Sequence, residues 1–127
     1  MTNQRTILIV EDEPSIMTFA SKLLEIMGHH VIRAEDGAQG LKVLAEETPD
    51  LVLLDLMIPG IDGWAILQRM KEDPQLSRIP VIVFSAFAEP SKIEAAKELG
   101  VTEYLVKPLS ASKLRETIKA VLADTAS

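Results

Sequence analysis

The chain has 127 residues, of which 47% are hydrophobic and 25% charged, so its length and composition suit one globular domain and argue against a disordered chain. Its net charge is −6 and no cluster of lysine or arginine occurs, which argues against direct nucleic-acid binding because phosphate contacts dominate that affinity. The absence of cysteine excludes disulfides, thiolate metal sites and a thiol nucleophile. Residues 1–5 are polar and no apolar run approaches ~18 residues, so we expect a cytoplasmic protein without membrane contact.

Short apolar runs alternate with amphipathic segments along the chain. The runs predict strands, and apolar residues at helical spacing predict the helices between them. In chain order, the predicted elements are a strand at 7–10, a helix from Pro14 to the stop at Gly28, a strand at 31–34, a helix marked by Leu41, Leu44 and Ala45 and ended by Pro49, a strand at 51–54, a helix at about 64–71, a strand at 80–84, a helix at 90–99, a strand at 103–106, and a helix opened by Ser110 and running through Leu122.

Five strands alternating with five helices predict an α/β fold with a doubly wound parallel sheet. The apolar runs are continuous, which is typical of strands buried on both faces. Parallel strands bring their carboxyl ends to one edge of the sheet, and ligands of such folds bind beyond that edge. We therefore expect the residues that follow the strands to lie close together.

Three carboxylates stand at these strand ends. Glu11 and Asp12 follow the first strand, and Asp55 follows the third. Their like charges should raise the pKa of at least one of them. A hard divalent cation would relieve the repulsion, and carboxylates with waters suit Mg²⁺. Acidic residues after strands are usually helix caps, which remains the favoured interpretation of Glu13 and Asp62.

A hydroxyl and an ammonium complete the edge. Ser85 ends the fourth strand and Lys107 the fifth. Lys107 at this position would pair with Asp55 or with a bound anion, and the Ser85 hydroxyl could donate to a phosphoryl oxygen. A carboxylate flanked by a metal and a lysine can attack phosphorus and form an acyl phosphate. The residues thus predict Asp55 as a phosphoacceptor.

The order and spacing of these motifs resemble the receiver domains of two-component response regulators. The resemblance runs from Thr6 to about Ala123. It rests on Glu11 and Asp12, on Asp55 with Pro59, Gly60, Asp62 and Gly63, on Ser85 and Ala86, and on Tyr104, Lys107 and Pro108. It implies a flavodoxin-like, five-stranded sheet of order 2-1-3-4-5 with five flanking helices, and a cis Lys107–Pro108 bond.

The resemblance also implies a role for each site residue. Asp55 would accept a phosphoryl group from a histidine kinase or a histidine phosphotransfer protein. Asp12, Asp55 and the backbone carbonyl of Met57 would bind Mg²⁺ (or Mn²⁺), with Glu11 acting through a metal-bound water. Ser85 and Lys107 would contact the phosphoryl oxygens.

Ser85 would also form a switch pair with Tyr104, which implies a two-state surface made of the fourth helix, fifth strand and fifth helix. Met57 and Phe87 flank the site and are bulky and apolar. They should hinder attack by water and lengthen the life of the phosphoryl group, so replacing both with small polar residues should speed its loss. Weak self-phosphorylation and self-dephosphorylation, rather than enzyme turnover, are expected.

Some positions depart from the family pattern. The first acidic residue is Glu11 rather than the commoner Asp, and Leu109 replaces the usual Phe. Thr102 and Thr117 stand where paired charges form a dimer in the winged-helix subfamily, which lowers the expectation of such a dimer. We expect a monomer or a weak, phosphorylation-dependent dimer.

Two other functions on a similar sheet are disfavoured by local residues. A phosphatase with an aspartyl-phosphate intermediate needs a second acid two positions after its nucleophile, and Met57 cannot protonate a leaving group. A flavin site must cradle a phosphate in the first loop, where Glu11, Asp12 and Glu13 repel anions. His29 and His30 are interpreted as a solvated connection, and Trp64 as a packing residue.

We expect one receiver domain over residues 1–127, with a core of about 6–123 and a short tail at 124–127. That arrangement leaves no room for an output domain. The chain would act alone on a downstream protein effector, or it would be the receiver of a longer regulator.

Overall fold

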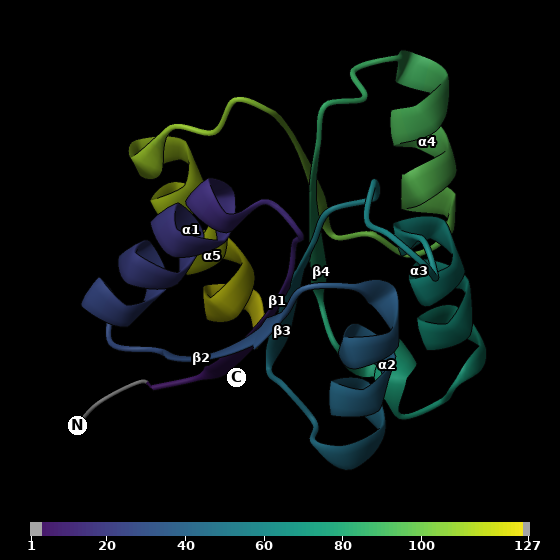
Figure 1. Cartoon of the computed structure of the whole chain (residues 1–127), viewed down its shortest axis with the longest axis horizontal. Coiled ribbons are helices and arrows are strands. Elements are labelled where there is room, and N and C mark those ends of the chain that lie inside the picture. Colours follow the sequence, from purple (N-terminus) through teal and green to yellow (C-terminus); the bar gives the residue numbers. More distant parts are fainter. Residues whose placement is uncertain (1–3, 126–127) are drawn as a thin grey trace.

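The computed structural model describes residues 4–125 and contains one parallel sheet. Its strand order is β2-β1-β3-β4-β5, and every neighbouring pair of strands is parallel. The strands are β1 (Thr6–Val10), β2 (His30–Ala34), β3 (Leu51–Leu54), β4 (Val81–Ser85) and β5 (Glu103–Val106). This order, with five α-helices around the sheet, confirms the predicted flavodoxin-like α/β fold (Figure 1).

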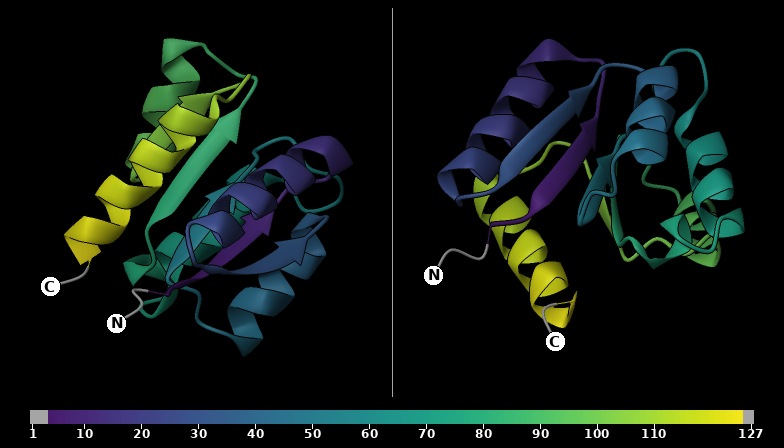
Figure 2. Two further views of the ribbon diagram at one scale, coloured as in Figure 1. Left: turned by 90° about the vertical axis from the view of Figure 1, so that its left-hand side faces the viewer. Right: turned by 90° about the horizontal axis from the view of Figure 1, so that it is seen from below.

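The helices form two layers, one on each face of the sheet. Helices α1 and α5 cover one face, and α2, α3 and α4 cover the other (Figure 1). The left view of Figure 2 looks onto α1 and α5 in front of the strands. Their bounds are α1 (Pro14–Ile26), α2 (Gly37–Glu46), α3 (Gly63–Glu72), α4 (Pro90–Glu98) and α5 (Ala111–Thr125).

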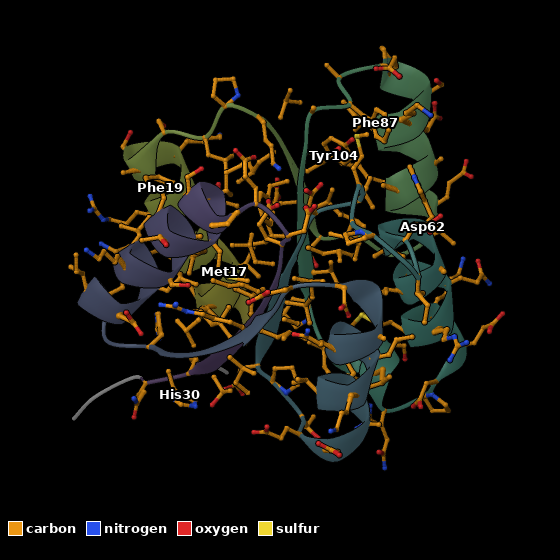
Figure 3. All side chains as sticks on the ribbon, in the orientation of Figure 1. Met17, Phe19, His30, Asp62, Phe87 and Tyr104 are labelled. Atoms are coloured by element: carbon orange, nitrogen blue, oxygen red, sulfur yellow. The ribbon has the colours of Figure 1, made fainter. Side chains whose placement is uncertain are left out.

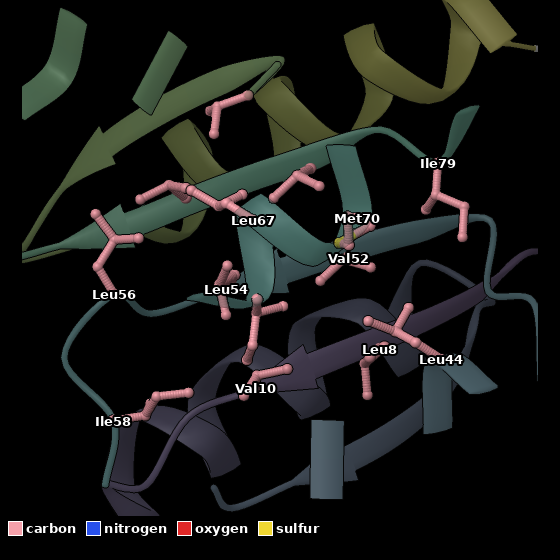
Figure 4. Packing of buried hydrophobic residues seen from close by; sticks show 14 of the residues in the cluster. Leu8, Val10, Leu44, Val52, Leu54, Leu56, Ile58, Leu67, Met70 and Ile79 are labelled. Atoms are coloured by element: carbon pink, nitrogen blue, oxygen red, sulfur yellow. The ribbon is translucent and has the colours of Figure 1, made fainter. Parts of the chain in front are cut away.

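Strands β1, β3 and β4 are buried on both faces, as their continuous apolar runs predict. The strands at the edges of the sheet, β2 and β5, are only partly buried, and Val106 in the apolar run of β5 is 40% exposed. In β1, Ile7 and Ile9 face the α1 and α5 layer, whereas Leu8 and Val10 face the α2 to α4 layer. Figure 4 shows the second layer, with Leu8, Val10, Val52 and Leu54 lying beside buried side chains of the covering helices. Burial of this apolar surface is the main term that favours the fold.

Several element boundaries differ from the predicted ones. His30 belongs to β2, where it pairs with Thr6, so it does not lie in a connection. Helix α2 begins at Gly37, because the Asp36 side chain caps it by accepting a hydrogen bond from the Gln39 amide (2.8 Å). Three other ends shift by one residue: β4 starts at Val81, α3 starts at Gly63 and α4 ends at Glu98. The structure also contains a short 3-10 helix at Leu76–Arg78 that the sequence did not predict. Caps and backbone pairing, rather than apolar spacing, determine these ends.

Helix α5 extends to Thr125, so it includes two residues of the predicted tail, and residues 126–127 lie outside the described part of the chain. Within residues 4–125, no helix combines the length and apolarity needed to cross a membrane.

Gly63 allows the loop after β3 to close tightly onto α3. A Cβ atom at this position would lie 2.8 Å from the Asp55 carbonyl oxygen and 2.5 Å from the Leu56 Cα. The Gly63 amide donates to the Leu56 carbonyl at 3.1 Å. This close backbone approach requires glycine and holds the segment that carries Asp55.

Candidate phosphoacceptor site

Backbone pairing brings the strand ends to one edge of the sheet. Val10 and Leu54 are register partners, and the Asp55 amide donates to the Val10 carbonyl at 3.0 Å. The Lys107 amide donates to the Ser85 carbonyl at 2.8 Å in the same way. The ladder therefore fixes the strand ends, and the carboxylates that follow β1 and β3 meet each other and the Lys107 ammonium that follows β5, as the sequence predicts.

Glu11, Asp12 and Asp55 form an acidic cluster in which one carboxylate oxygen of each lies within 4.8 Å of the others. Glu11 and Asp55 are buried, and Asp12 is exposed. Hard oxygen donors of this kind suit Mg²⁺ or Mn²⁺, with water completing the shell. The exposed Asp12 leaves the cluster open to an ion from solvent, so the residues present fit a divalent cation.

Lys107 bridges the two buried carboxylates. Its Nζ lies 3.0 Å from Glu11 Oε1 and 3.0 Å from Asp55 Oδ2. Burial alone would lower the pKa of Lys107, but the hydrogen bonds that it donates to Glu11 and Asp55, together with their negative charges, outweigh burial and raise it. Lys107 therefore remains an ammonium at this edge. The pairing with Asp55 agrees with the sequence analysis, whereas the second contact, to Glu11, was not anticipated.

Glu11 is the carboxyl group of the cluster whose pKa is raised. Burial raises the pKa of Glu11, and the Asp55 charge adds to the rise. The Glu13 amide, which donates to Glu11 Oε2 at 2.9 Å, and the Lys107 ammonium oppose it. The expectation of a raised carboxyl pKa is met, although burial contributes more than the like charge.

Asp55 is held by both of its oxygens. Oδ2 accepts from Lys107, and Oδ1 accepts from the Met57 amide at 3.0 Å. Met57, whose amide makes this contact, is 54% exposed. The site thus contains an oriented, buried carboxylate with the Lys107 ammonium at one oxygen and the Met57 amide at the other.

Ser85, Phe87 and Tyr104 form a hydrogen-bonded chain beside the acidic cluster. The Phe87 amide donates to the buried Ser85 Oγ at 3.2 Å, and the Tyr104 hydroxyl donates to the Phe87 carbonyl at 2.8 Å. Figure 3 shows Phe87 and Tyr104 next to each other near the carboxyl end of β4. Burial raises the pKa of Tyr104, so its hydroxyl stays protonated and able to donate. Sequence reasoning paired Ser85 with Tyr104 but missed the Phe87 backbone that connects them.

Other conspicuous residues lie outside the site. The Asp62 side chain caps α3 by accepting from the Ala65 amide (2.9 Å), and Trp64 packs against the core. Glu13 stands at the N-cap of α1 without a capping hydrogen bond from its side chain. His30 lies far from Phe87 in Figure 3, at the opposite end of the sheet.

The dimer positions considered from the sequence differ from each other. Thr117 is buried, and its hydroxyl donates to the Lys113 carbonyl at 2.8 Å, so this position of α5 faces the core. Thr102 is exposed.

The Lys107–Pro108 bond is cis, as the resemblance implies.

The fold and the edge residues define a class of protein. The sequence matches the response regulator receiver domain family over residues 7–119, and the chain belongs to this family. It is therefore a receiver domain of two-component signalling.

Individual relatives agree with this class. The chain is 38% identical over 117 residues to the protein PilH of Pseudomonas aeruginosa, covering 92% of this chain and 97% of PilH. It is 35% identical to a probable transcriptional regulator, ycf27, of Guillardia theta, covering 98% of this chain but 48% of that protein, so it spans about half the length of that relative. Its structure resembles the receiver domain of the sensor histidine kinase PA1611 of P. aeruginosa, which has magnesium in its active-site cleft (TM-score 0.84, 26% identity, 92% of this chain and 96% of that one).

Proposed function

We propose that this chain is a phosphoacceptor that receives a phosphoryl group on Asp55 from a histidine kinase or a histidine phosphotransfer protein. The observation that carries the proposal is the Asp55 carboxylate, buried beside the Lys107 ammonium at 3.0 Å and within the acidic cluster. Membership in the receiver family supports a histidine kinase as the donor.

The transfer needs a nucleophile, a charge stabiliser and a leaving group. An Asp55 oxygen attacks phosphorus, the P–N bond of the donor's phosphohistidine breaks, and the imidazole leaves as a neutral ring with its proton on the other nitrogen. Lys107, already in contact with Asp55, stabilises negative charge on the phosphoryl oxygens. Ser85 would donate its hydroxyl hydrogen to one of those oxygens.

Asp12, Asp55 and the Met57 carbonyl would hold Mg²⁺ or Mn²⁺, with Glu11 acting through a water. When bound, the ion neutralises charge on the carboxylates and on the incoming phosphoryl group. The protein's own part is to orient the Glu11 and Asp55 carboxylates, which Lys107 and the amides of Glu13 and Met57 do by donating hydrogen bonds to them.

The phosphoryl group is removed by water, which attacks phosphorus and releases inorganic phosphate and the free Asp55 carboxylate. Met57 and Phe87, two positions after Asp55 and Ser85, are bulky and apolar and would slow this reaction by excluding water. Weak self-phosphorylation from small donors and slow self-dephosphorylation follow from the same chemistry. A phosphatase remains disfavoured, because Met57 offers no acid for a leaving group.

The output is a change in protein contacts. Movement of Ser85 toward a phosphoryl oxygen would alter its bond to the Phe87 amide, and through the Phe87 carbonyl would bias Tyr104. This couples Asp55 to the surface of α4, β5 and α5, where a downstream effector binds or a weak dimer forms on phosphorylation. The receiver would act alone or as part of a longer regulator. The two relatives illustrate both cases, because the match covers 97% of PilH but 48% of ycf27.

The proposal is tested by intact mass after incubation with Mg²⁺ and acetyl phosphate. The native chain should gain the mass of one phosphoryl group, and Asp55→Asn should gain none. An equal gain in both would overturn the assignment of Asp55.

A further inference from the structure

Phe87 is contacted from three elements through three different groups. Its amide donates to Ser85 Oγ (3.2 Å) and its carbonyl accepts from the Tyr104 hydroxyl (2.8 Å). Its ring lies under the Lys92 ammonium, with Nζ 4.7 Å from the ring centroid. The backbone contacts belong to the phosphorylation site and its switch pair, whereas the ring contact comes from α4.

The ring contact anchors a loop that is otherwise exposed. Phe87 is half-buried and packs against the core, while its neighbours Ala86, Ala88 and Glu89 are exposed. Lys92 is half-buried, and the ion pairs found within residues 4–125 do not include it. A cation on a phenyl face is worth about two- to five-fold in an equilibrium at such a partly exposed site.

We propose that Lys92 is a positioning residue for the phosphorylation site. It holds the Phe87 ring, and thereby the Ser85–Phe87–Tyr104 chain, in the arrangement that keeps water from the acyl phosphate on Asp55. This inference rests on the proposed function and adds its regulation: the lifetime of the phosphoryl group is set in part from α4. A contact that draws Lys92 off the ring would shorten that lifetime.

The test follows loss of phosphate from the full chain. Each variant is phosphorylated with acetyl phosphate and Mg²⁺, the donor is removed, and the phosphorylated fraction is followed by intact mass. Lys92→Gln should lose phosphate about two- to five-fold faster than the native chain, as expected from loss of the cation. Lys92→Arg keeps a cation for the ring and should retain the native rate. Lys97→Gln makes the same charge change at an exposed position of α4 and should also retain it.

A double-mutant comparison ties the effect to the ring. Phe87→Leu keeps apolar bulk but removes the aromatic face, so adding Lys92→Gln to it should cause no further acceleration. Equal urea midpoints for these variants would show that altered folding does not cause the change in rate.

Two results would overturn the inference while leaving Asp55 as the phosphoacceptor. One is a native decay rate in Lys92→Gln. The other is that Lys92→Gln speeds phosphate loss by the same factor in the Phe87→Leu variant as it does in the native chain. By contrast, absence of phosphoryl gain in the native chain would remove the proposed function itself, and this inference with it.

Discussion

Removing the Lys107 ammonium should destabilise the fold in a pH-dependent way. Lys107→Met keeps most of the apolar stem but leaves the Glu11 and Asp55 carboxylates without their shared cation. The Lys107 side chain is 18% exposed, and those of Glu11 and Asp55 are 0% and 5% exposed. Breaking a buried ion pair by removing one partner costs roughly 3–5 kcal/mol. Because the exposed Asp12 side of the cluster admits water, we expect the lower end, about 3 kcal/mol.

The pH dependence separates charge from packing. The pKa of Glu11 is already raised in the native chain, and loss of Lys107 should raise it further. A raised folded-state pKa means that the folded variant binds protons more readily than its unfolded chain, so its stability falls as pH rises. The deficit of the variant should therefore be largest near neutral pH and shrink as the carboxylates protonate toward the ordinary Glu value of 4.5.

Urea unfolding without divalent cations measures this deficit at a series of pH values. Lys113→Met, which removes an exposed lysine from α5, is the matched control and should stay close to the native stability. Native stability in Lys107→Met near neutral pH, or a deficit that does not change with pH, would refute the reasoning. A deficit that does not change with pH would mean that the stability is lost through packing of the apolar part of the Lys107 side chain, and not through its charge.

Three further outcomes follow from single residues. Mg²⁺ should raise the free energy of unfolding by about 2.7 kcal/mol when its concentration is one hundred times its dissociation constant. Urea titration should show that this stabilisation is lost in Asp12→Asn and kept in Glu13→Gln, because Asp12 belongs to the acidic cluster and Glu13 does not. Burial chiefly lowers the pKa of His29 below 6.5, so the unfolded chain binds more protons and stability should fall as pH drops through and below that value. His29→Gln should flatten this fall in stability, measured by thermal unfolding at a series of pH values, and an unchanged pH dependence would contradict this. Ser21 Oγ is buried and has no hydrogen-bond partner among residues 4–125, so Ser21→Ala should raise the free energy of unfolding, measured with urea, by about 1 kcal/mol; a loss of stability would contradict this.

The fold could be predicted because its signals are local. Each buried strand is a continuous apolar run, and Pro14, Gly28 and Gly100 limit helices in ways that depend on backbone sterics alone. The ends of helices were less accurate, because caps such as Asp36 act through a single hydrogen bond that apolar spacing does not reveal.

The residues of the site could be predicted from the sequence, but the hydrogen bonds and ion pairs between them could not. Parallel strands guarantee that Glu11, Asp12, Asp55 and Lys107 meet at one edge. The sharing of Lys107 between two carboxylates depends on rotamers, which no residue pattern specifies. The link through Phe87 was missed for a related reason: its amide and carbonyl make the contacts, and every residue type carries those groups.

Location of the phosphoryl group tests the central claim most directly. The native chain is incubated with acetyl phosphate and Mg²⁺, the acyl phosphate is trapped by borohydride reduction, and peptides are mapped by mass spectrometry. We predict that the reduced residue is Asp55 and that trapping requires Mg²⁺. Modification at Asp12, Glu11 or any other carboxylate, or equal trapping after removal of divalent cations, would contradict the account.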